Sequence, residues 1–176
     1  MTNCAYRMGN AARELPGGYK TISIPIFKNK SYEPGLEVSF TNQMIDQFNR
    51  SNVAHVVSDD LSETRLVGEI TKVDYQGLAV KKSGESSVPF LPNGTVLATE
   101  YRIVLELSLS LVRKVDGKVL WSNTFSGERS YAAPKVTLAE VNSANPLYNL
   151  SARRQNIEAI AVDMMAEVHD RMTENF

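Results

Sequence analysis

The chain is poor in cysteine and histidine and has no long apolar run. Its single cysteine, Cys4, cannot form an internal disulfide, which excludes a disulfide-stapled scaffold. Its two histidines, His55 and His169, have no histidine or cysteine nearby at the spacing of a metal site. No stretch of 18 apolar residues occurs, so the sequence predicts no membrane-spanning helix.

The chain also lacks an excess of charge of either sign. It carries 19 basic and 20 acidic side chains, for a formal net charge of -1. Such a balance gives no overall attraction to nucleic acid or to an anionic membrane. With 176 residues, 43% of them hydrophobic, the chain is long enough to bury a core without a staple.

The recognised catalytic motifs are missing. We find no glycine-rich strand-to-helix turn, no phosphate-binding loop and no nucleophile elbow. His169 stands beside Asp170 and is expected on a solvated helix face, and His55 is expected in a short strand. The sequence therefore predicts a protein that is not an enzyme and needs no cofactor or metal.

The first half of the chain alternates short strand and helix patterns. Residues 21–27 alternate as a half-buried strand, but Pro25 has no amide to donate and places this strand at an edge or at a bulge. Apolar residues then recur every four positions from Leu36 to Phe48, as on one face of a helix. Residues 53–57 follow as a short strand.

The next segments are predicted to be a strand and a long connection. Residues 64–75 have strand composition, and Gly68 inside them indicates a bulge or a close backbone approach. Residues 76–98 are rich in glycine, serine and proline and are expected to be irregular. This connection contains Lys81 and Lys82.

The clearest signal is the strict alternation of residues 101–111, which predicts a long antiparallel strand with one wet face. Asp116-Gly117 predicts a type I′ turn into a second strand at 119–125. Tyr101, Trp121 and Phe125 fall on the core face, so base stacking and nucleic-acid binding are not expected. Apolar residues at helical spacing over 157–172 predict a closing helix.

Together these elements predict an α+β fold. We expect a two-layer sandwich in which a mixed or antiparallel twisted sheet of about four to five strands has two helices packed on one face. Residues 1–19 are expected to be an N-terminal tether, because they follow neither hydrophobic period. Residues 20–176 are expected to be a single domain.

Two groups of basic residues admit two interpretations. One is Lys81 and Lys82, and the other is Arg113, Lys114 and Lys118 around the predicted turn. The first and favoured interpretation is that these side chains are solvated by water and protect the strand edges. The second is an anionic ligand, because lysine and arginine gather around phosphate groups.

The order of short motifs resembles the LptE family of lipopolysaccharide-assembly lipoproteins over nearly the whole chain. The matching segments are Cys4-Ala5-Tyr6-Arg7, Leu15-Pro16, Ile22 to Phe27 with Lys28-Asn29, Glu33-Pro34-Gly35-Leu36, Gly68-Glu69-Ile70, Ala98-Thr99-Glu100-Tyr101-Arg102, Gly117-Lys118-Val119-Leu120-Trp121, and Phe125-Ser126-Gly127 through Tyr131. Each motif is mild, but their order and spacing together are specific.

This resemblance implies an outer-membrane lipoprotein on the periplasmic side of a Gram-negative bacterium. Cys4 matches the cysteine that carries the acyl chains, and two acyl signals are needed for stable anchoring. Only residues 1–3 precede Cys4, and we expect them to stand in place of a leader. The implied partner is the β-barrel LptD, which the domain would plug and help to assemble.

The resemblance also implies contact with lipopolysaccharide, a ligand rich in phosphates and carboxylates. The candidate residues for this contact are Lys81, Lys82, Arg102 and Lys135. The alternative function is a free periplasmic carrier for an amphipathic lipid or glycolipid, which would need a sizeable apolar cavity.

Overall fold

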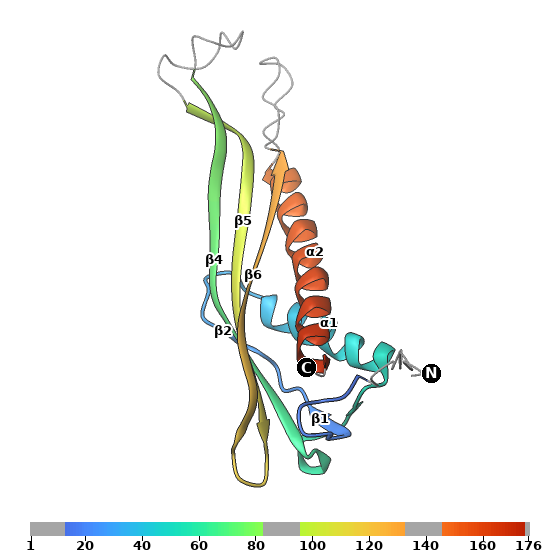
Figure 1. Ribbon diagram of the computed structural model, residues 1–176. Helices are drawn as coiled ribbons and strands as arrows, with labels where there is room; N and C mark the ends of the chain where they lie inside the picture. Colours follow the sequence, from blue (N-terminus) through green and yellow to red (C-terminus); the bar gives the residue numbers. More distant parts are fainter. Residues whose placement is uncertain (1–12, 83–95, 133–145, 175–176) are drawn as a thin grey trace, which may run out of the picture.

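The computed structural model describes residues 13–82, 96–132 and 146–174, and only the backbone of residues 79–82, 96–99 and 146–149. These residues form a mixed six-stranded sheet with two helices on one face (Figure 1). The predicted α+β fold is therefore confirmed. The sheet has six strands rather than the expected four to five. One of the two-residue strands is too short to show an alternation of apolar and polar residues in the sequence.

Pro25 interrupts the first strand. Strand β1 (Thr21–Ser23) ends before it, and the chain rejoins the sheet as β2 (Lys28–Asn29), which pairs in parallel with the fourth strand. Strand β1 lies between two other strands, so the predicted edge position is wrong. Because the chain leaves the ladder at the proline, Ile24 stays buried while Ile26 is 68% exposed.

Helix α1 (Leu36–Ser51) begins and ends near the predicted positions. Its buried stripe includes Leu36, Phe40, Met44 and Phe48, as the four-residue period indicates. The helix leads to β3 (His55–Val56), which pairs in parallel with β1, and then to a short 3-10 helix, η1 (Asp59–Leu61).

The two longest strands pair with each other within the sheet. Strand β4 (Thr64–Lys82) pairs antiparallel with β5 (Val96–Arg113) along their whole lengths, up to Lys82 opposite Val96. The predicted irregular connection over 76–98 is therefore wrong for residues 76–82 and 96–98, and residues 83–95 lie outside the described residues. The glycines and polar residues of 76–82 give no local strand signal, because the strand conformation of this segment depends on pairing with a later part of the chain.

Gly68 permits a close approach of backbone and side chain, as predicted. A Cβ atom at this position would lie 2.6 Å from ring carbons of Phe27. The irregularity of the ladder falls slightly later, between Ile70 and Lys72.

Strand β6 (Val119–Ala132) completes the hairpin with β5. The turn differs from the predicted type I′ turn, which needs positive φ at both central residues. Here Gly117 has a φ of 70°, and Asp116 does not have a positive φ. The Arg113 amide donates to the Lys118 carbonyl at 2.8 Å, so four residues form the loop.

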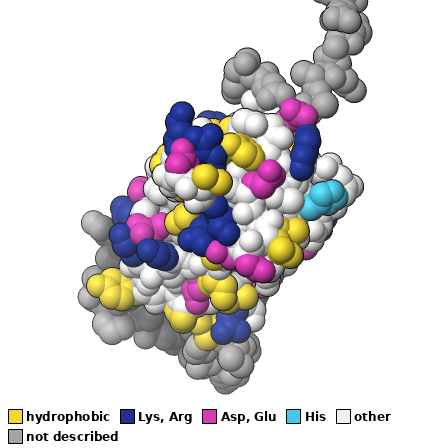
Figure 2. All heavy atoms as spheres, turned by 90° about the horizontal axis from the view of Figure 1, so that it is seen from below, with side chains coloured by type: hydrophobic (Ala, Val, Ile, Leu, Met, Phe, Trp, Pro, Cys, Tyr) yellow, Lys and Arg dark blue, Asp and Glu magenta, His cyan; other side chains and the backbone are white. Residues whose placement is uncertain are grey.

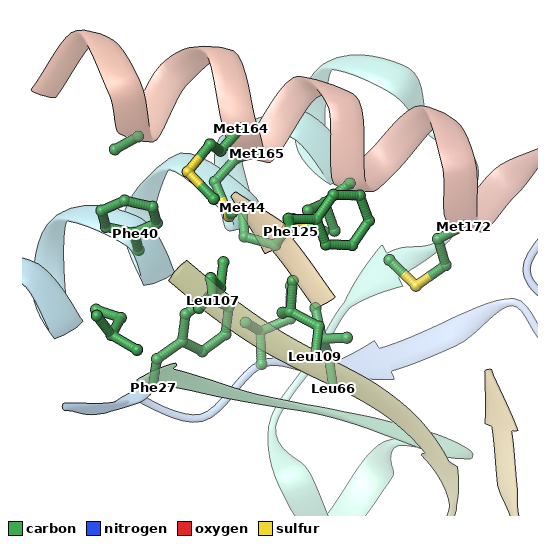
Figure 3. Close-up of a cluster of buried hydrophobic side chains, with 14 of the residues drawn as sticks. Phe27, Phe40, Met44, Leu66, Leu107, Leu109, Phe125, Met164, Met165 and Met172 are labelled. Atoms are coloured by element: carbon green, nitrogen blue, oxygen red, sulfur yellow. The ribbon is translucent and has the colours of Figure 1, made fainter. Parts of the chain in front are cut away.

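Helix α2 (Pro146–Thr173) crosses the sheet beside α1 and over β6 (Figure 1). Figure 3 shows the core between the layers, where Leu107 and Leu109 of β5 and Phe125 of β6 face methionines of both helices. Leu15, within the predicted tether, is only 1% exposed and belongs to the same core. The packed part of the chain therefore includes Leu15.

Candidate functional site

The sheet face opposite the helices carries many polar side chains. Because side chains alternate along a strand, the residues between the buried leucines of β5 point away from the core. We call this surface the wet face. Its hydroxyl-bearing residues on β5 and β6 are Ser108, Ser110, Ser122, Thr124, Ser126 and Ser130.

Some hydroxyl groups on the wet face form hydrogen bonds with one another or with the backbone. Ser108 Oγ and Thr124 Oγ1 lie 3.1 Å apart across β5 and β6. Ser122 donates to the Leu109 carbonyl at 3.2 Å. Ser126 and Ser130 are exposed, so the face can form further hydrogen bonds with a polar partner.

Several charged side chains on the wet face form loose ion pairs. Arg102 Nη1 lies 3.8 Å from Glu128 Oε2, and both side chains are more than a third exposed. Lys72 Nζ lies 3.7 Å from Asp74 Oδ2. These are loose surface pairs, so Arg102 can exchange its partner for an anionic ligand at little cost.

The structure separates the predicted ligand residues that it describes. Arg102 stands opposite Gln76 in the ladder, whereas Lys81 and Lys82 stand opposite Leu97 and Val96 near the end of β4. At about 3.3 Å per residue, five or six residues along a strand span roughly 16 to 20 Å. Cys4 and Lys135 lie outside the described residues.

Two cations of the second basic group, Arg113 and Lys114, form ion pairs. Arg113 Nε and Nη2 donate to the two oxygens of the Asp116 carboxylate, at 2.9 and 2.5 Å. Lys114 Nζ lies 3.6 Å from Asp59 Oδ2. Arg65 beside Asp59 lowers the pKa of that carboxyl to about 2. These contacts agree with a structural role for Arg113 and Lys114.

A half-buried polar cluster, missed by the sequence analysis, joins α2 to the sheet. Arg153 pairs with Glu33, and its Nε donates to the Tyr75 hydroxyl at 2.8 Å. The Tyr75 hydroxyl donates to Glu33 Oε2 at 2.8 Å, and the Arg153 guanidinium carbon lies 4.2 Å from the centre of the Tyr75 ring. Burial, then Tyr131, raises the pKa of Tyr75 to about 12. No local sequence signal links these residues, because they are far apart in the chain.

His169 is buried, so the predicted solvated position is wrong. Its Nε2 lies 2.8 Å from Ser51 Oγ, its ring meets Phe48 edge-on at 5.1 Å, and its Nδ1 lies 3.6 Å from Asp170 Oδ1. Burial lowers the pKa of His169 from its ordinary value. The two helices cross at this residue, which sequence neighbours alone do not reveal.

The Ser51, His169 and Asp170 arrangement resembles a catalytic triad in composition only. His169 is 3% exposed, which leaves no room for a substrate beside its ring. Ser51 ends α1, where the outward carbonyls create a negative potential that opposes an oxyanion. The cluster is therefore a structural contact between the helices.

Two open pockets are lined by described residues. One lies beside the β5–β6 turn against Tyr19 and Glu63, and the other lies at the start of α1 against Arg154 and Glu158. Both are open to solvent and include charged residues in their lining, and neither is the enclosed apolar cavity that an acyl chain needs. Among the described residues no cluster of metal-ligating side chains occurs, and neither α1 nor α2 combines the length and apolar character needed to cross a membrane.

Comparison with known proteins assigns a family and a fold. A family model described as LptE, lipopolysaccharide-assembly, matches residues 19–172, which is most of the chain. No curated protein matches the chain in sequence.

Several solved structures share the fold at low sequence identity. A candidate homolog of a neuraminyllactose-binding hemagglutinin from Helicobacter pylori is 14% identical, with a TM-score of 0.54 over 94% of this chain and 89% of that one. A candidate lipoprotein from Caulobacter crescentus is 9% identical, with a TM-score of 0.52 over 84% and 88%. PelC from Paraburkholderia phytofirmans, a dodecamer, is 15% identical, with a TM-score of 0.51 over 94% and 96%.

Proposed function

The chain belongs to the LptE family of lipopolysaccharide-assembly proteins, and we propose that it plugs an LptD-type outer-membrane β-barrel and assists its assembly. In this role it enables lipopolysaccharide to reach the outer leaflet. The family match over residues 19–172 is the observation that carries the proposal.

The wet face supports the plug function. The interior of an outer-membrane barrel is polar, so a plug must present hydrogen-bonding groups to the barrel wall. The wet face offers serine and threonine hydroxyls along β5 and β6, and its charges are loosely paired. The long axis of the sheet lies along β4, β5 and β6, which gives this surface an elongated shape (Figure 1).

We propose that Cys4 carries acyl chains that hold the protein at the periplasmic side of the outer membrane. Cys4 lies nine residues before Arg13, where the described chain begins. Two chains are required because a single acyl chain binds a membrane only marginally. Loss of Cys4 should therefore release the protein from the membrane without changing its fold.

Direct contact with lipopolysaccharide is proposed through Lys81, Lys82, Arg102 and Lys135. The distance along β4 between Lys81 and the position opposite Arg102 implies two contact points rather than one. A large ligand with several phosphates can span such points. The carrier alternative gains no support from the pockets that the described residues line, because both are open to solvent and neither is an enclosed apolar cavity.

Depletion of the protein from its native cells tests the assembly function. We expect the yield of folded barrel, measured by its heat-dependent gel mobility, to fall together with surface lipopolysaccharide. A plasmid copy with its native leader should restore both, and a Cys4→Ala copy, which loses label from a fatty-acid analogue, should restore them poorly. Unchanged barrel folding in depleted cells would contradict the proposal.

A further inference from the structure

Three large aliphatic side chains are exposed at one end of the molecule. Val115 in the β5–β6 turn is 92% exposed, Leu61 of η1 is 70% exposed, and Val119 at the start of β6 is 53% exposed. We call these three residues the apolar tip. Figure 2 looks at this end and shows hydrophobic side chains standing among paired basic and acidic ones.

Polar contacts hold the segments of the apolar tip together. The Lys114 amide donates to the Glu63 carbonyl at 3.0 Å, which ties the hairpin turn to the segment after η1. Lys114 also reaches Asp59 at the other end of η1. Leu61 and Val115 therefore belong to two segments that are fixed against each other, and their exposure is a property of the folded state.

Charges around the apolar tip cancel one another. Arg65 and Lys114 share Asp59, Arg113 pairs with Asp116, and Lys20 pairs with Glu14. With Lys118, Asp60 and Glu63 of the same segments, five cations stand against five anions. Such a surface has no strong field with which to attract an anionic partner. The aliphatic groups are the part of this end that gains from leaving water.

The apolar tip lies toward the end of the molecule where the described chain begins (Figure 1). Arg13, the first described residue, pairs with Asp170 near the end of α2 at 2.5 Å. The nine residue-to-residue steps from Cys4 to Arg13 span at most about 30 Å when fully extended. A membrane anchor at Cys4 would therefore bring this end of the molecule within reach of the lipid surface.

We propose that the apolar tip inserts into the boundary between head groups and acyl chains of the membrane to which the chain is anchored. This inference rests on the proposed anchoring at Cys4, and it adds a second, protein-based contact. The anchor raises the effective concentration of the tip at the surface, so three aliphatic side chains suffice where they would bind weakly alone. Two contacts also fix the orientation of the long sheet relative to the membrane.

Two single residues of the chain allow a direct test. Cys4, the only cysteine, can be coupled to a maleimide head-group lipid in phosphatidylcholine vesicles, which replaces the acyl anchor. Trp121, the only tryptophan, lies two residues after Val119 and reports on lipid contact. We expect brominated phosphatidylcholine to quench Trp121 fluorescence in the coupled protein, because bromine quenches only at close range.

Variants distinguish insertion from simple proximity. Leu61→Asp with Val115→Asp should abolish the quenching, because charged groups at the tip oppose insertion. Leu150→Asp, which changes an exposed leucine near the start of α2, should leave the quenching intact. Quenching should be equal in roughly 0.1 M and 1 M salt, where the Debye length falls from about 10 to 3 Å.

The emission maximum of each variant without vesicles checks that Trp121 keeps its folded environment. Absence of quenching in the coupled wild-type protein would overturn the proposal, and so would quenching that persists in the double variant. Neither result depends on the barrel or on cellular acylation, so failure of the tip is separate from failure of the proposed function.

Discussion

At the scale of single residues, His169 connects the two helices of the fold. Its ring is buried between the end of α1 and α2, with Ser51 at one nitrogen and Asp170 near the other. Asp170 favours the protonated ring and Arg13 opposes it, but burial dominates and lowers the pKa of His169. The folded state therefore prefers a neutral histidine.

We expect this preference to make stability depend on pH below about 6.5, the ordinary pKa of the group. When the folded-state pKa is lower than the unfolded-state pKa, the unfolded chain binds the proton first, so the stabilisation is present above pH 6.5 and is lost as the pH falls toward the folded-state pKa. Urea unfolding at pH 7 and pH 5 should show this loss.

A His169→Gln variant is the matched control, because glutamine can still bond Ser51 but does not titrate. Its free energy of unfolding should change less between pH 7 and pH 5 than that of the wild type. The low pKa of Asp59, about 2, places its titration below this window. An equal change in both proteins would contradict a role for His169.

Gly68 and Gly127 each lie against another side chain, and these two side chains differ in flexibility. A Cβ at Gly68 would lie 2.6 Å from the rigid ring of Phe27, whereas at Gly127 it would meet the flexible side chain of Met164 at 2.5 Å. We expect Gly68→Ala to cost about 1 to 3 kcal/mol of stability by overpacking and Gly127→Ala to cost less. The urea midpoints of the two variants measure these losses of stability. A larger loss in Gly127→Ala than in Gly68→Ala would show that the Phe27 ring can move.

Leu107 tests the assignment of the core face. It is fully buried on β5, and Leu107→Ala should cost about 2 to 5 kcal/mol by opening a cavity. Ser126→Thr, on the exposed face of β6, is the control and should change the free energy of unfolding by less than about 0.5 kcal/mol. A Leu107→Ala effect as small as the control would mean that the faces are reversed.

At the scale of elements, local patterns predict some segments better than others. The alternation over 101–111 and the four-residue period of α1 are local signals, because each reflects one face packed against the core. The upper part of β4 has no such signal around Gly77. It is a strand because β5 pairs with it, and this partner follows in the chain only after residue 95.

The polar cluster of Glu33, Tyr75 and Arg153 fixes the first half of α2 on the sheet. It connects the segment before α1, strand β4 and helix α2, which are distant in sequence. The sequence shows an arginine on a helix and cannot show that the guanidinium lies over a tyrosine ring. The loss of Arg153 would leave Glu33, whose side chain is 18% exposed, without its counter-charge.

We expect Arg153→Met to destabilise the docking of α2 by about 1 to 3 kcal/mol, because it leaves the half-buried Glu33 carboxylate without its counter-charge. Amide hydrogen exchange should become faster in residues 150–157 while the end of α2 near His169 keeps its protection. Arg154→Met, one position along on an exposed part of the helix, is the matched control. Unchanged exchange in residues 150–157 would show that apolar packing alone holds this part of the helix.

At the scale of the whole molecule, the two ends and the two faces of the sheet differ in character. One face is covered by helices, the wet face is rich in hydroxyls, and one end carries the apolar tip. The order of motifs in the sequence predicts the family, which the match over residues 19–172 confirms. The apolar tip escaped prediction, because Leu61 and Val115 are ordinary aliphatic residues until the fold brings their segments to one exposed end.

The most direct test of the proposed plug is co-purification of the barrel with the full-length tagged protein, expressed with its leader and extracted from outer membranes in mild detergent. We predict one barrel per chain, and less barrel with Thr124→Arg and Ser126→Arg, which place bulky charges on the wet face. Fatty-acid labelling should be equal in both samples. Wild-type protein that is acylated and membrane-bound but recovered without the barrel would contradict the account.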